Sequence, residues 1–332
     1  MQLDFTSDQE ELRDSVRSVL DKECTRAVVR DHLDRVVRGE ESDAPARLWK
    51  TFVSLDWPAL TVPEEHGGIG LGYPELAVVA EELGKVLALG PLLTTMAGFV
   101  PLLREAQGGG EWLARIASGE ISGTAAFDGY ALCGAEVDHV AVVGDGGIVI
   151  TPGAAAAASI HSLDLTRTIS HIDGSDGDRL EINTDGIRRA REEMTVALAF
   201  ELVGTCQTIF ETSLAYAKER HQFGVPIGSF QAVKHKLTNM FVALERARAL
   251  CIFATATINE DDPRRTTASS AAKAAAGDCQ RLVAQDGIQL LGGIGYTWEH
   301  DQHFFVKRAK VSDAVLGNAS HHRQLIADGL GV

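Results

Sequence analysis

A compact set of basic and amide side chains stands out in the stretch RHQFGVPIGSFQAVKHKL, residues 220–237. Arg220 and Gln222 precede a turn-forming run, FGVP, and Gln231 opens the segment that follows. Guanidinium groups bind phosphate oxygens in a bidentate way, and the first turn of a helix carries N–H groups that favour anions. The stretch therefore predicts either an anion-binding turn or an ordinary connection between two helices with a solvated arginine.

A second motif, QLLGGIGYTWEHD, combines an amide side chain with paired glycines. Gln289 stands near a predicted helix end, and Gly292 and Gly293 follow it closely. Paired glycines let a ligand approach the backbone, and their N–H groups can face an anion. A plain helix C-cap would use the same residues. No GxGxxG motif follows a predicted strand, so the sequence does not favour a Rossmann-type site.

Changes in composition divide the chain into three zones, which we predict to be three domains. Residues 1–118 show helical spacing of apolar residues, beginning with a capping box at Thr6 and Gln9. Residues 119–187 contain Val and Ile pairs broken by glycine and aspartate, which predicts short strands joined by tight turns such as the GDGG hairpin. Residues 188–332 return to helical patterns. The predicted fold is mainly α with a small β module.

Four long helices are predicted in the C-terminal zone, and the two motifs lie at their ends. Alanine and glycine are frequent in the third helix, so neighbouring helices can approach it closely, and we expect a four-helix bundle that forms oligomers. On the fourth helix, we expect Lys307 and Arg308 to face solvent or an interface. His321 and His322 are expected in a solvated tail.

The overall charge narrows the classes of ligand. The 332-residue chain has a formal net charge of −15, which argues against nucleic acid, because binding a phosphate backbone needs a basic surface. Five cysteines show neither CxxC nor metal-ligand spacing, so we predict reduced thiols, no metal site and a cytoplasmic location. No apolar run is long enough for a transmembrane helix, and the acidic N-terminal stretch does not resemble a secretory signal.

Together, the two motifs resemble those of the acyl-CoA dehydrogenase family. The pattern RxxFGxPIxxFQ, then a helix, then QxxGGxGYT is specific, and LTVPEEHGGIGLGYPELAVVAEELGK at residues 60–85 is similar to the family's first-domain loop and helix. The resemblance covers nearly the whole chain. It implies a helical N-terminal domain, a reduced β-domain and a C-terminal bundle. It further implies FAD as cofactor, α,β-desaturation of an acyl-CoA thioester, and an electron-transfer flavoprotein as electron acceptor.

The resemblance also implies site residues. In the family, the two turns bind the pyrophosphate and adenosine end of an FAD whose flavin ring lies in the neighbouring subunit. Carried over to this sequence, the predicted FAD contacts, which we call the clamp residues, are Arg220, Gln222, Phe223 and Gln231, with Gln289, Gly292 and Gly293 opposite.

Two departures from the family pattern concern the reaction itself. The β module shows neither the TEPxxGSD-like segment nor the Trp-Ile/Val-Ser/Thr-Asn-Gly-like strand that wrap the flavin in the family. Proton removal beside the thioester carbonyl needs a positioned carboxylate, yet Leu316 occupies the usual Glu position. Other members place the Glu where this chain has Met194, so the neighbouring Glu193 is a candidate base; the alternative is a solvated carboxylate at a helix start.

These departures leave several functions open. We expect a subunit of a heterotetrameric acyl-CoA dehydrogenase, acting on a steroid-type or other bulky acyl-CoA, whose partner subunit supplies the flavin pocket. A self-sufficient homo-oligomeric dehydrogenase is an alternative. A non-catalytic scaffold without flavin, and a related oxidase or monooxygenase, are the others.

Overall fold

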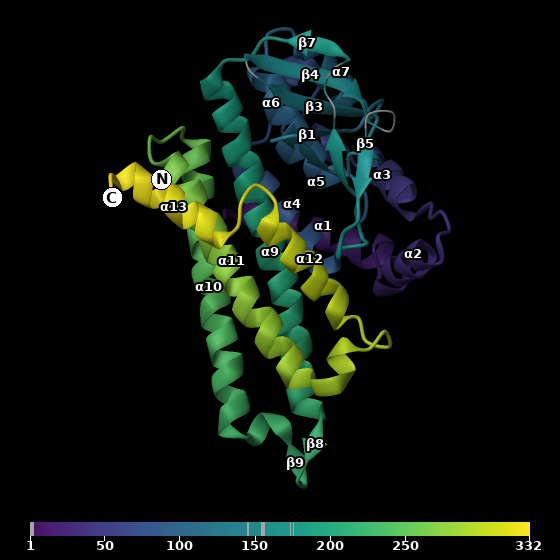
Figure 1. Ribbon diagram of the computed structural model, residues 1–332, viewed down its shortest axis with the longest axis vertical. Coiled ribbons are helices and arrows are strands. Elements are labelled where there is room, and N and C mark those ends of the chain that lie inside the picture. Colours follow the sequence, from purple (N-terminus) through teal and green to yellow (C-terminus); the bar gives the residue numbers. More distant parts are fainter. Residues whose placement is uncertain (1–2, 145, 154–156, 173, 175) are drawn as a thin grey trace. The chain divides into compact units, whose positions relative to one another are not determined.

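The computed structural model describes residues 3–144, 146–153, 157–172, 174 and 176–332, which are mainly helical with one seven-stranded sheet (Figure 1). The chain divides into two compact units. The sheet unit comprises Thr6–Val79 and Ala88–Ala197, and the bundle unit comprises Met1–Phe5, Ala80–Leu87 and Leu198–Val332. Among the described residues, no helix combines the length and apolar composition needed to cross a membrane.

Short helices make up the N-terminal part of the chain. They are α1 (Ser7–Glu23), α2 (Arg26–Arg38), α3 (Ala44–Ser54), η1 (Trp57–Ala59), η2 (Glu64–His66), α4 (Tyr73–Val86), α5 (Leu92–Thr94), the π-helix η3 (Thr95–Phe99), α6 (Val100–Glu105) and α7 (Gly110–Ala117). The predicted capping box is confirmed: the Gln9 N–H donates to Thr6 Oγ1 (3.3 Å) and the Thr6 N–H donates to Gln9 Oε1 (2.9 Å). Helix α4 begins at Tyr73, inside the stretch 60–85 that resembles the first-domain loop and helix of the family.

The sheet has the strand order β5-β6-β2-β1-β3-β4-β7, and its β1–β3 pair is parallel. The strands are β1 (Gly123–Phe127), β2 (Tyr130–Leu132), β3 (His139–Gly144), β4 (Gly147–Pro152), β5 (Ala157–Ile160), β6 (Ile169–Ile172) and β7 (Asp178–Leu180). Gly144 pairs with Gly147, which confirms the predicted hairpin; Asp145 and residues 154–156 of the alanine run lie outside the described residues. The core of the sheet is built from Ala126, Ala131, Cys133, Val137, Val140 and Ile172.

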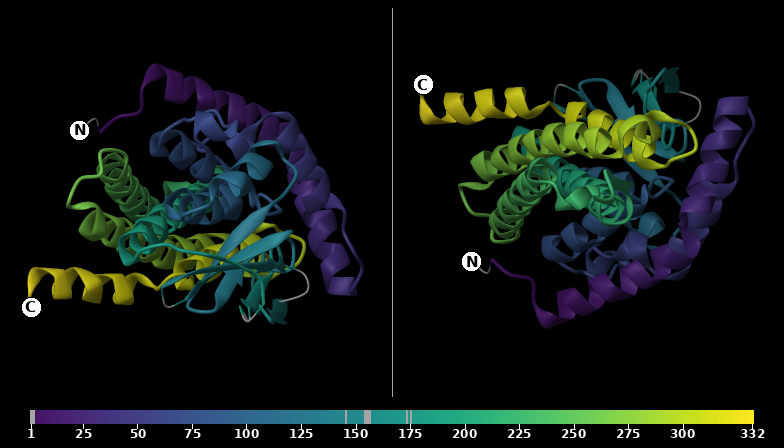
Figure 2. Two further views of the ribbon diagram at one scale, coloured as in Figure 1. Left: turned by 90° about the horizontal axis from the view of Figure 1, so that it is seen from above. Right: turned by 90° about the horizontal axis from the view of Figure 1, so that it is seen from below.

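Long helices carry the C-terminal part of the chain, as predicted. They are α9 (Thr184–Glu219), α10 (Gln231–Asn259), α11 (Arg265–Leu291), α12 (Gln302–Ala314) and α13 (Ala319–Leu330). Between them lie β8 (His221–Gln222), β9 (Val225–Pro226), η4 (Ile227–Ser229) and η5 (Gly292–Tyr296). In Figures 1 and 2, α10 and α11 run side by side. The boundaries of the three predicted domains stay a prediction.

Small residues bring the helices of the bundle unit into close contact. A Cβ built on Gly84 of α4 would lie 2.1 Å from Glu201 O of α9, and one built on Gly204 would lie 2.0 Å from Glu81 O. No larger residue fits at either position, so the two helices meet backbone to backbone. All five cysteines are buried, and none of them forms a disulfide within the described residues.

Candidate functional site

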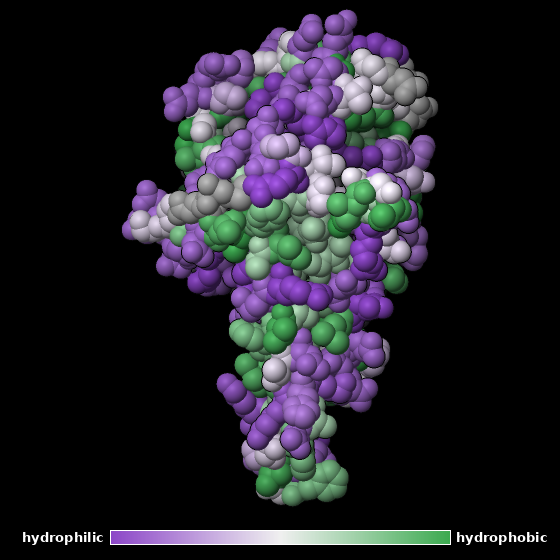
Figure 3. All heavy atoms as spheres, turned by 90° about the vertical axis from the view of Figure 1, so that its left-hand side faces the viewer, coloured by the Kyte–Doolittle hydropathy of each residue, from purple (hydrophilic) through white to green (hydrophobic). Residues whose placement is uncertain are grey.

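The first motif folds into a two-stranded hairpin in the bundle unit. β8 and β9 pair through His221↔Pro226 and Gln222↔Val225, which leaves Phe223 and Gly224 as the turn. Their φ angles are +55° and +81°, as a type I′ turn requires. Phenylalanine rarely adopts this conformation, and here 93% of its surface is exposed. Figure 3 accordingly shows apolar surface at the lower tip, where Figure 1 places the hairpin.

Backbone contacts hold the hairpin on the ends of its flanking helices. Arg220 directly follows α9, and its carbonyl accepts a 2.7 Å hydrogen bond from the Ile227 N–H of η4. A Cβ on Gly228 would lie 2.9 Å from Ala217 O, so η4 packs closely on α9. Because α10 begins at Gln231, immediately after η4, the turn and the start of α10 are fixed together.

The long polar side chains of both motifs are exposed to solvent. Arg220, Gln222 and Gln231 are exposed, and so is Gln289 on α11. Within the part of the chain that the structure describes, none of these four side chains forms a hydrogen bond or ion pair. Their donors are therefore free for a ligand.

The glycines of the second motif border open space. Gly292 ends α11 with φ +65°, and a Cβ built on Gly292 or Gly293 would meet no atom within 4 Å. Both glycines are exposed, so a ligand could reach their backbone. The sequence analysis did not assign Lys234 and His235 to the site. Both are exposed in the first two turns of α10, and Lys234 adds positive charge beside the hairpin; the KHK run was their signal.

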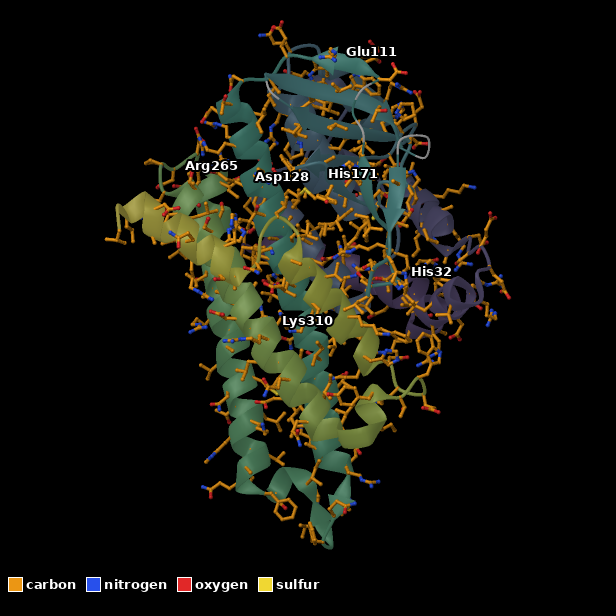
Figure 4. The ribbon with its side chains drawn as sticks, in the orientation of Figure 1. His32, Glu111, Asp128, His171, Arg265 and Lys310 are labelled. Carbon is orange, nitrogen blue, oxygen red and sulfur yellow. The ribbon has the colours of Figure 1, made fainter. Side chains whose placement is uncertain are left out.

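The candidate base Glu193 lies in the sheet unit and is not solvated. Its side chain is buried, and its carboxylate accepts a 2.5 Å hydrogen bond from Arg104 Nη2. Two residues earlier on α9, Arg191 pairs with Asp128 of the β1–β2 turn; Asp128 is labelled in Figure 4. The expectation of a solvated helix-start carboxylate is therefore wrong, because Glu193 is buried and its carboxylate is bonded to Arg104. Because this carboxylate is already bonded to Arg104, the assignment of Glu193 as the base stays a prediction.

Leu316 lies in the connection between α12 and α13, and its backbone is in the left-handed region. Its φ is +57°, and Gly317 follows with +99°. Leucine adopts this conformation at a cost of about 1–2 kcal/mol, so the surrounding structure must enforce it. His322 contributes, because its Nε2 lies 3.1 Å from Leu316 O. A carbonyl only accepts, so Nε2 carries a proton.

Lys273 of α11 holds the same connection from inside the bundle unit. Its Nζ donates to three carbonyl oxygens, those of Ser312 (3.0 Å), Asp313 (2.7 Å) and Gly317 (2.9 Å). Lys273 is fully buried, and burial lowers its pKa to about 8. All three ammonium protons therefore have a partner.

Two expectations about polar residues near the C-terminus are wrong for one residue each, His322 and Arg308, while His321 is exposed as expected. His322 is buried beneath the connection it bonds, and only His321 is exposed. Arg308 is 2% exposed and does not face solvent. Its Nη1 donates to Glu201 Oε1 (2.7 Å), and Ser312 Oγ donates to Glu201 Oε2 (2.9 Å). Local sequence did not reveal this pair, because its members are far apart in the chain.

Comparisons with known proteins identify the family. The family model "Acyl-CoA dehydrogenase, N-terminal domain" matches residues 6–120, and "Acyl-CoA dehydrogenase, C-terminal domain" matches residues 184–331. The chain is 32% identical to acyl-CoA dehydrogenase IpdE2 of Mycobacterium tuberculosis over 306 residues, which cover 92% of each protein.

Solved structures of the same fold include assemblies of two named proteins. The ChsE4-ChsE5 complex from Mycobacterium tuberculosis aligns with a TM-score of 0.87 and 22% identity, covering 100% of this chain and 99% of that one. A Tcur3481-Tcur3483 steroid ACAD variant aligns with a TM-score of 0.83 and 21% identity, covering 98% and 99%. The chain thus belongs to the acyl-CoA dehydrogenase family of oxidoreductases.

Proposed function

We propose that this chain is one subunit of a heteromeric, FAD-dependent acyl-CoA dehydrogenase, which desaturates an acyl-CoA thioester between its α and β carbons. The observation that carries the proposal is Leu316 at the position where the family pattern has its glutamate. Leucine cannot accept a proton, and the reaction needs a carboxylate. The partner subunit is therefore the source of the base.

The environment of Glu193 supports the proposal that the partner subunit supplies the base. Its carboxylate is buried and ion-paired with the Arg104 guanidinium, so it already has a structural partner within this chain. The connection that holds Leu316 is itself fixed by Lys273 and His322. These contacts favour a structural role for the part of α9 around Glu193 and for the α12–α13 connection.

The clamp residues fit the diphosphate and adenosine end of FAD. The Arg220 guanidinium is free to bind phosphate oxygens in a bidentate way, and Gln222, Gln231 and Gln289 offer further amide donors. The exposed Phe223 ring suits stacking on an adenine. The open backbone at Gly292 and Gly293 suits close approach of a phosphate. When bound, FAD supplies the hydride acceptor of the reaction.

An unlike partner subunit and a bulky substrate are the finer parts of the proposal. Two similar structures are described as a ChsE4-ChsE5 complex and as a steroid ACAD of two named proteins, which supports a two-protein assembly and a steroid-type or other bulky acyl-CoA. Phe241 and Val242 of α10 are 50% and 59% exposed, which supports a subunit contact along this helix. The electron-transfer flavoprotein and the cytoplasmic location stay predictions.

A flavin spectrum tests the proposal. The chain is purified alone and again after co-expression with an acyl-CoA dehydrogenase-like protein encoded beside its gene. We expect a colourless protein alone and a yellow assembly that a suitable acyl-CoA bleaches. A chain that is yellow alone and is bleached by an acyl-CoA would instead be self-sufficient. Absence of flavin from every assembly would support the scaffold alternative.

A further inference from the structure

One ion pair joins the two helices that carry the motifs. Lys236, in the second turn of α10, donates through Nζ to Asp286 Oδ1 on α11. Along the sequence, Lys236 follows Gln231 by five residues, and Asp286 precedes Gln289 by three. Figure 1 shows the hairpin and the C-terminal end of α11 toward the same end of the bundle unit. The pair therefore connects the two helices close to both sets of clamp residues.

The two partners differ in their exposure to solvent. The Asp286 side chain is 8% exposed, whereas that of Lys236 is 38% exposed. A buried carboxylate is costly unless it is paired, so Lys236 is drawn to a fixed position on α11. An exposed lysine that served only solubility would have no such constraint.

The α11 side of this contact is itself rigid. A Cβ on Gly287, the next residue, would lie 2.7 Å from Ile209 Cγ2 of α9 and 2.9 Å from Gln302 Nε2 of α12. The end of α11 is thus packed closely against two other helices. The ion pair then ties the start of α10 to this fixed end.

We propose that Asp286, acting through Lys236, is a positioning residue for the FAD clamp, an inference that rests on the function proposed above. Residues three apart on a helix share a face, so Asp286 lies on α11 about one turn before Gln289, toward the N-terminus. The same bond holds the first two turns of α10, and with them Gln231 and the adjoining hairpin that bears Arg220. The pair sets the spacing between the two halves of the clamp.

A matched control exists on the same helix. Asp278 of α11 pairs with Arg323 of α13 at 2.9 Å, and their side chains are 32% and 53% exposed. Asp278 lies eight residues before Asp286 and away from both motifs in the sequence. Asp278→Asn therefore removes one carboxylate charge from α11 without touching the clamp.

The experiment measures FAD dissociation constants of the assembly by flavin fluorescence, together with its unfolding in denaturant without FAD. We expect Asp286→Asn and Lys236→Gln to weaken FAD binding at least tenfold, Lys236→Arg to restore it to within about threefold, and Asp278→Asn to leave it within about twofold. If Asp286→Asn does not fold, the Lys236 variants decide.

Two outcomes separate this inference from the function on which it rests. If Arg220→Ala weakens FAD binding while Asp286→Asn and Lys236→Gln change only the unfolding transition, the pair is merely structural and the inference is overturned. If Arg220→Ala also leaves FAD binding unchanged, the clamp assignment itself is wrong.

Discussion

Two regions of the bundle unit differ in whether their polar side chains are exposed without a partner or buried and hydrogen-bonded. At the hairpin and the end of α11, Arg220, Gln222 and Gln289 are exposed, and their side chains have no partner among the described residues. At the α12–α13 connection, Lys273 and His322 are buried and bonded to backbone carbonyls. The first region thus has exposed donors without a partner among the described residues, whereas the second has its hydrogen bonds satisfied within the chain.

In the function proposed above, the first region keeps its part of a shared site and the second has lost its part. Exposed donors cost little stability, because water satisfies them until a ligand arrives. A buried segment must satisfy its own polar groups. Once leucine replaces a carboxylate at residue 316, the segment around it can serve as internal structure. Variants in the two regions should therefore affect different measurements.

The largest expected effect is on stability, in the buried region. Arg308→Met leaves the Glu201 carboxylate buried without its guanidinium partner, so we expect the unfolding free energy to fall by about 3–5 kcal/mol. Denaturant unfolding measures the loss. The double variant Arg308→Met, Glu201→Leu should recover most of it. A loss below about 1 kcal/mol in the single variant would contradict the burial of this pair.

Lys273→Met should be the next most severe change. It removes the donor from three carbonyls at once, and we expect a loss of about 2–4 kcal/mol at pH 7. Proteolysis near α13 should accelerate as the connection loosens. Unchanged stability and unchanged proteolysis would show that the connection does not need this amine.

The same lysine gives a pH dependence of defined sign. Its folded pKa is about 8, below the ordinary value of 10.5. Between these values the unfolded chain binds more protons than the folded chain, so the contribution of Lys273 to stability rises with pH. The difference in unfolding free energy between the native chain and Lys273→Met should grow by up to about 3 kcal/mol from pH 8 to 10.5. A difference that shrinks over this window would contradict the lowered pKa.

In the exposed region, Arg220 variants should change ligand binding and leave folding intact. Arg220→Ala removes the bidentate donor, and we expect FAD affinity in the assembly to fall at least tenfold, about 1.4 kcal/mol. Arg220→Lys should recover only part of this, because an ammonium cannot form the paired contact. Thermal unfolding without FAD should be unchanged, and a large shift there would show that Arg220 has an unrecognised structural role.

The smallest expected effect concerns Phe223, where one substitution should change the stability of the chain and its FAD binding in opposite directions. Phe223 has φ +55° and is almost fully exposed, whereas an Asn-Gly turn suits this conformation. We expect Phe223→Asn to stabilise the chain by about 0.5 kcal/mol and yet to weaken FAD binding. Equal or tighter FAD binding by this variant would exclude adenine stacking on the ring.

The sequence determined the helical framework, because local signals set it. The capping box at Thr6 and Gln9, the strand turn at Gly144 and Gly147, and the end of α11 at Gly292 all lie where short-range patterns predict them. Each of these signals acts over a few residues, so the linear chain contains all the information required. The two motifs and the family were identified in the same way.

Tertiary structure alone decided which charges are buried. Arg308 pairs with Glu201, and Glu193 pairs with Arg104. Lys273 donates hydrogen bonds to three carbonyl oxygens. In each case the partners are far apart in the sequence. A lone charged residue in a sequence looks solvated, because burial is costly until a partner compensates it. That partner is brought close only when the helices pack. Whether a charged side chain is buried is therefore decided by the fold, whereas the start and end of a helix are decided by the local sequence.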